Sequence, residues 1–108
     1  MERQKQEQFI IVLLDSKHRY LAEEDVTKGI SNKRLVHPRE VFASAIEHRA
    51  ATLICAHNHP SGDSEPSQED FRVTERLVEV GKLVGISVLD HVIVGGDNYT
   101  SFADKCLL

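Results

Sequence analysis

Residues 51–70 read ATLICAHNHPSGDSEPSQED. Along them an apolar stretch is followed by loop-forming residues and then by the start of a helix. The first six residues are apolar or small and are bounded by polar residues, which predicts a short central strand. The segment from His57 to Glu69 contains two prolines, a glycine and several small polar residues, which indicates a loop. A helix is expected to begin after Ser67.

The chain before this stretch predicts a hairpin and a helix. Residues 9–15, FIIVLLD, form an aliphatic run that ends in turn-forming residues, and residues 19–28 are expected to pair back on it as a more polar strand. Residues 29–33 are a loop. Pro38 suits the first position of a helix. The residues expected on the inward face of that helix are Val41, Phe42, Ala45 and Ile46.

The chain after residue 70 predicts a helix to about Leu83, ended by Gly85, and then two strands. Residues 86–94 form the first strand, residues 95–98 (GGDN) a hairpin turn, and residues 99–102 a short edge strand. This edge strand could pair with a second copy of the chain, so a homo-oligomer is one expected state. The inward face of the helix is predicted to carry Phe71, Thr74, Leu77, Val78 and Gly81.

The order of these elements, β-β-α-β-α-β-β, predicts an α/β or α+β fold with a helix on each side of a mixed sheet. With 108 residues the chain has the size of one domain. We expect a polar N-terminal segment over residues 1–8 and a single domain over residues 9–108.

Composition argues against several classes of function. The formal net charge is −4, which gives no basic field for phosphate backbones and argues against direct nucleic-acid binding. The longest apolar run, residues 9–14, is far too short to span a membrane. Cys55 and Cys106 form no CxxC pair and suggest no disulfide framework, so a cytoplasmic location is expected.

His57, His59 and Asp70 are candidate metal ligands. Residues two apart on a strand project to the same side, so both imidazoles can face one point at the end of the strand. The following loop can bring Asp70, in the first turn of the next helix, toward them. Two imidazole nitrogens and one carboxylate oxygen leave a fourth tetrahedral position for water, as in catalytic zinc sites.

Simpler interpretations exist for the same residues. Two histidines can be polar residues at a strand end, and Ser67-x-x-Asp70 also fits a helix capping box. Ser67 can cap the helix while Asp70 binds a metal. We interpret His91 as a structural strand residue in preference to a partner of the metal site, and Cys55 as a buried apolar residue in preference to a thiolate ligand.

The pattern HxHPSGxxxPSxxD, from His57 to Asp70, resembles the JAMM motif of JAB/MPN-domain metalloproteases in the form carried by the bacterial DNA repair protein RadC. The resemblance extends over nearly the whole chain, including VHPREVF at residues 36–42 and VGISVLDHVIVGG at residues 84–96. It implies a three-layer JAB/MPN (cytidine-deaminase-like) architecture and a Zn²⁺-dependent hydrolase that attacks an amide of a peptide or protein substrate. It also implies zinc held by His57, His59 and Asp70, with Ser67 steadying the oxyanion.

The resemblance further implies a glutamate upstream of the histidines as general base. Glu7, just before the first strand, fits the position that the family uses. Glu40, at the start of the first helix, is the competing choice.

Two other functions remain open. The chain could act as a DNA repair or recombination factor through DNA or protein partners, although family members carry an N-terminal helix-hairpin-helix-like region that we expect this chain to lack. It could also be an inactive interaction module, which would bind little zinc. Substrate specificity is expected to reside in loops such as residues 29–33 and 61–66.

Overall fold

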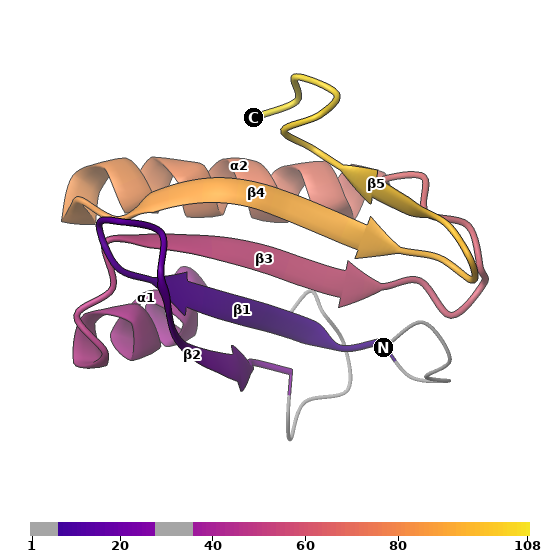
Figure 1. Cartoon of the computed structure of the whole chain (residues 1–108). Coiled ribbons are helices and arrows are strands. Elements are labelled where there is room, and N and C mark those ends of the chain that lie inside the picture. The colour runs from indigo at the N-terminus through magenta and orange to yellow at the C-terminus, as the bar shows by residue number, and fades with distance from the viewer. Residues whose placement is uncertain (1–6, 28–35) are drawn as a thin grey trace.

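The structure is a computed structural model that describes residues 7–27 and 36–108. The predicted loop at residues 29–33 and most of the polar segment at residues 1–8 lie outside these ranges. Figure 1 shows the elements, which are β1 (Phe9–Leu14), β2 (Tyr20–Asp25), α1 (Pro38–Glu47), β3 (Thr52–Asn58), α2 (Gln68–Val84), β4 (Ser87–Val94) and β5 (Tyr99–Ser101). None of the helices in these ranges is long and apolar enough to cross a membrane.

The five described strands form one mixed sheet in the order β2-β1-β3-β4-β5. Strand β1 pairs antiparallel with β2 and β3, whereas β3 and β4 are parallel and β5 returns antiparallel to β4. A parallel pair needs a crossover connection, and α2 provides it between β3 and β4. The predicted α+β class, the mixed sheet and the central position of β3 are confirmed.

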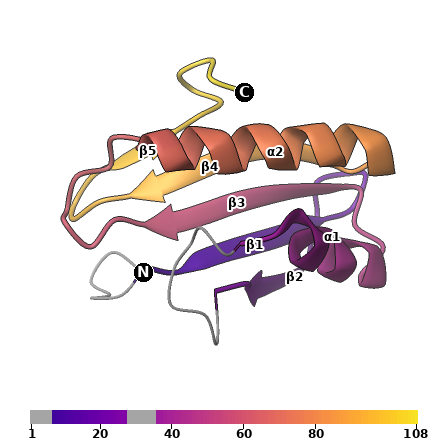
Figure 2. The same ribbon diagram turned by 180° about the vertical axis from the view of Figure 1, so that it is seen from behind.

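Both helices pack on the same face of the sheet, which corrects the expected three-layer arrangement with a helix on each side. Figure 2 shows α1 and α2 together in front of the sheet, and Figure 1 shows both behind it. Alternate residues of the paired strands, such as Ile11 and Cys55, point to this face and form one core with both helices. The helices also meet each other, since a Cβ atom on Gly81 would lie 3.5 Å from the ring of Phe42.

Most residues predicted on the inward faces of the two helices are buried, but each face differs from the prediction at one or two positions. Ile46 of α1 is 59% exposed, and Ser44 is buried in its place. Phe71 of α2 is 41% exposed, whereas Val73 is buried. Thr74, Leu77 and Gly81 of α2 are buried, as predicted. The buried stripe begins at Asp70, a polar residue that apolar periodicity does not predict, and it includes Asp70 and Val73 in place of Phe71 and Val78.

Candidate metal centre

The end of β3 and the start of α2 meet at one edge of the sheet. The backbone N–H of His59 donates to the carbonyl oxygen of Val94 at 2.8 Å, which keeps the chain beside β4 for one residue beyond the strand. Gly62 then turns the chain with a φ of +88°, a value that favours glycine. The loop ends at Ser67, the N-cap of α2.

The three predicted ligands converge on one another. Nε2 of His57 lies 3.0 Å from Oδ1 of Asp70, and Nε2 of His59 lies 3.0 Å from Oδ2 of the same carboxylate. One candidate ligand atom from each residue lies within 4.8 Å of the others. The side chains of His57 and Asp70 are 1% exposed and that of His59 is 12% exposed, so the group is accessible from the His59 side. The arrangement could hold a metal ion.

Hydrogen bonds at the far side of each imidazole orient the Nε2 atoms toward Asp70. Nδ1 of His59 lies 2.8 Å from the carbonyl oxygen of Asp63, which can only accept, so Nδ1 carries a proton. In a neutral ring the lone pair is then on Nε2, the nitrogen that faces Asp70. Nδ1 of His57 lies 2.7 Å from Nε2 of His91. Such partners are typical of metal-binding histidines, because they set the tautomer and the ring orientation.

The carboxylate of Asp70 also begins helix α2. The backbone N–H of Ser67 donates to Oδ2 of Asp70 at 2.7 Å, and the backbone N–H of Asp70 donates to Oγ of Ser67 at 3.2 Å. This reciprocal pair is a capping box. A buried carboxylate in the first turn is further stabilised by the positive end of the helix dipole. The capping interpretation is therefore confirmed, and the same carboxylate faces the two imidazoles.

A family model described as RadC-like JAB domain matches residues 1–107. The chain belongs to this family. It is 53% identical over 105 residues to a UPF0758 protein of Methanosarcina mazei, a match that covers 97% of this chain and 46% of that protein. It is 51% identical over 104 residues to a UPF0758 protein of Alkaliphilus metalliredigens, covering 96% of this chain and 45% of the relative. The chain thus spans about half the length of these relatives.

The two candidate general bases of this RadC-like JAB domain, Glu7 and Glu40, lie near opposite ends of strand β3. Phe9 is opposite His57 in the β1–β3 pairing, and the backbone N–H of Gln8 donates to Oδ1 of Asn58 at 2.6 Å. Glu7 therefore leads into β1 beside the end of β3 that carries the histidines. Glu40 is in the first turn of α1, which lies toward the other end of β3 (Figure 1), and its exposed side chain is 3.9 Å from Arg39.

His91 and Cys55 of the RadC-like JAB domain are opposite each other in the β3–β4 pairing. Burial raises the pKa of the Cys55 thiol to about 12, so Cys55 is a buried thiol, as predicted. His91 is a strand residue, as interpreted, but its ring also contacts the candidate ligand His57 and Thr74. A shift in the pairing register after Leu53 places His91 on the helix-covered face. No local sequence pattern predicts such a shift.

Proposed function

We propose that this RadC-like JAB domain is a zinc-dependent hydrolase that attacks an amide bond, with His57, His59 and Asp70 as the metal ligands. The observation that carries the proposal is the placement of two imidazole Nε2 atoms against the two oxygens of one buried carboxylate. Two imidazoles and one carboxylate form a three-ligand set used by catalytic zinc, with one position left for water.

Zinc bound there would supply a Lewis acid and lower the pKa of its water to about 7. Glu7 would take a proton from the attacking water and pass it to the leaving amine. Ser67 would donate its hydroxyl hydrogen to the developing oxyanion, since Oγ already accepts from the backbone N–H of Asp70 and its own hydrogen can point elsewhere.

The proposed substrate is a peptide or protein, and the loop at residues 61–66 borders the site. Oγ of Ser64, a buried side chain, lies 3.0 Å from Oγ1 of Thr100, which fastens this loop to β5. The carbonyl oxygen of Asp63 in the same loop orients His59. We therefore expect loop substitutions that break these contacts to change metal binding as well as substrate choice.

Metal analysis of purified protein tests the proposal. Wild-type protein should contain about one equivalent of zinc and hydrolyse members of a peptide pool. His57→Ala and Asp70→Asn should lose both properties. His18→Ala is the matched control, because His18 is an exposed histidine in the β1–β2 turn and should keep both. Full zinc content in both ligand variants would reject the assignment.

The same preparation separates the two alternative functions. Zinc-free wild-type protein with an intact fold would favour an interaction module. A salt-sensitive shift of duplex or single-stranded DNA would favour direct DNA binding, which the net charge of −4 argues against.

A further inference from the structure

A chain of side-chain contacts starts and ends at Asp70. The hydroxyl of Thr74 donates to the backbone carbonyl oxygen of Asp70 at 2.7 Å. Nδ1 of His91 contacts Oγ1 of the same threonine, and Nε2 of His91 lies 2.7 Å from Nδ1 of His57. The other nitrogen of His57 faces the Asp70 carboxylate at 3.0 Å. The contacts therefore link α2, β4 and β3 in one circuit.

The directions of these hydrogen bonds follow from the donors available. A hydroxyl has one hydrogen, and Thr74 uses it on the carbonyl oxygen of Asp70, so the contact with His91 requires a proton on Nδ1 of His91. In a neutral ring, Nε2 of His91 is then an acceptor. Nδ1–H of His57 donates to it, so a neutral His57 has its lone pair on Nε2.

We propose that His91, oriented by Thr74, is a positioning residue that fixes the tautomer in which His57 binds the metal through Nε2. This inference rests on the proposed metal site. The opposite direction would place the proton of His57 on Nε2, and that nitrogen could not bind a metal. Thr74 thus determines which nitrogen of His91 carries the proton, and His91 in turn determines which nitrogen of His57 does.

Packing holds the His91 ring in the required orientation. The ring is 0% exposed and lies between Phe9 and Phe102, with ring centroids 5.5 and 4.8 Å away. The Asp90 carboxylate fixes the turn that carries Phe102, since it accepts hydrogen bonds from Oγ of Ser101 at 2.6 Å and the backbone N–H of Ala103 at 2.9 Å.

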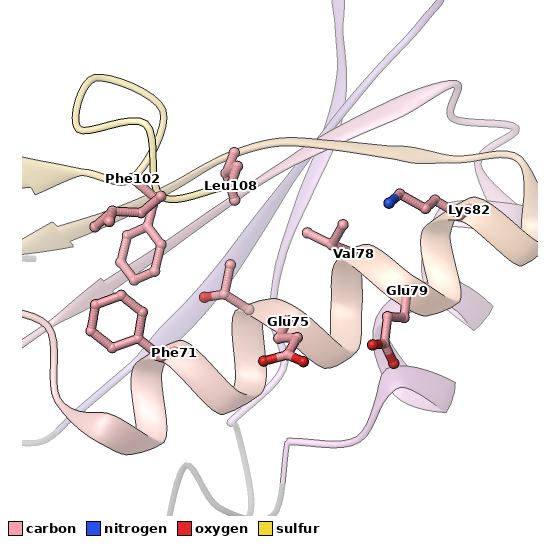
Figure 3. Close-up of a pocket in the computed structure, with 9 residues that line it drawn as sticks. Phe71, Glu75, Val78, Glu79, Lys82, Phe102 and Leu108 are labelled. Carbon is pink, nitrogen blue, oxygen red and sulfur yellow. The ribbon is translucent and has the colours of Figure 1, made fainter.

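Phe102 also separates His91 from a surface pocket. Figure 3 shows Phe102 and Phe71 side by side in the wall of this pocket, and their ring centroids are 5.3 Å apart. Thr74 also lines this pocket, so the buried contacts lie close to solvent at Thr74, while the ring of Phe102 lies against that of His91.

Zinc affinity, measured by competition with a chromophoric chelator, tests the proposal. His91→Phe keeps an aromatic ring and removes the acceptor, and Thr74→Val keeps the shape and removes the hydroxyl. Each should weaken zinc binding by about 10- to 100-fold. Thr74→Ser keeps the hydroxyl and should bind as wild type. Leu77→Ala, a buried residue further along α2, controls for a general loss of stability and should also keep wild-type affinity.

The tautomer itself can be read by long-range ¹H–¹⁵N NMR of the zinc-loaded protein, which should show His91 with its proton on Nδ1. A proton on Nε2 of His91, or wild-type affinity in Thr74→Val, would overturn the role of His91 while leaving the metal site in place. Wild-type protein that binds no zinc would overturn both proposals. If His91→Phe does not fold, Thr74→Val and the NMR measurement decide.

Discussion

Asp70 and Ser67 form a reciprocal pair in which the backbone N–H of each residue donates to the side chain of the other, at 3.2 and 2.7 Å. The Asp70 oxygen that accepts from Ser67 is also 3.0 Å from Nε2 of His59. One carboxylate therefore both begins helix α2 and completes the candidate metal site, so the start of the helix determines where the third candidate ligand lies.

Substitutions at this pair should separate capping from metal binding. Asp70→Asn keeps an oxygen that can accept from the backbone N–H of Ser67, so α2 should still form, but zinc should be lost because the anionic ligand is gone. Ser67→Ala should lower the free energy of unfolding by about 1 kcal/mol and keep zinc. Zinc content and thermal unfolding of the two variants check this. Equal zinc content in both variants would contradict the division of roles.

Zinc should stabilise the folded protein. A metal that binds only the folded state adds about 2.7 kcal/mol to the free energy of unfolding at a free concentration 100 times its Kd. Thermal melts with zinc and with a chelator should show the difference. His59→Ala should unfold at the same temperature in both conditions, and a persistent shift in that variant would place the zinc elsewhere.

Glu7→Gln and Glu40→Gln should distinguish the two candidate bases. A glutamine at the position of the true base cannot accept the proton of water, so turnover should fall by about 10²- to 10⁴-fold while zinc content stays unchanged. We expect this result for Glu7→Gln and no change for Glu40→Gln. Loss of turnover in Glu40→Gln alone would transfer the role to Glu40.

The loop after His59 is packed against the β4–β5 turn. A Cβ atom on Gly95 would lie 2.5 Å from the carbonyl oxygen of Gly62, so Gly95→Ala should displace this loop and weaken zinc binding as well as stability. Gly81→Ala is the matched control, because its Cβ atom would meet the carbonyl oxygen of Ile86 at the far end of α2. It should cost about 1–3 kcal/mol of stability and leave the zinc affinity of folded protein unchanged.

The two cysteines should differ in reactivity. Cys106 is exposed, whereas burial raises the pKa of Cys55 from its ordinary value of 9.0 to about 12. Iodoacetamide should therefore modify Cys106 in the native protein and Cys55 only after unfolding. Because the folded state keeps Cys55 protonated, its contribution to stability is unchanged below pH 9.0 and decreases as the pH rises from 9.0 toward 12. Rapid native labelling of Cys55 would contradict its burial.

Local patterns in the chain were enough to predict that His57, His59 and Asp70 converge, and to predict the elements that carry them. The two-residue period of a strand places His57 and His59 on one side, and the capping pattern places Asp70 in the first turn of a helix. Both rules act over a few residues, so they can be applied without knowledge of the fold. The inward faces of the helices were predicted only in part, because two of their buried residues, Ser44 and Asp70, are polar.

The position of His91 depends on the tertiary structure. Leu53 is opposite Val88, but the next residue of β3 is opposite Asp90, so β4 holds one extra residue at that point. Without this shift His91 would be opposite Ala56 and would point to the other face of the sheet. A one-residue shift reverses the side to which every later side chain points. The side of the sheet that α1 covers is likewise set by contacts between distant residues, which no local pattern encodes.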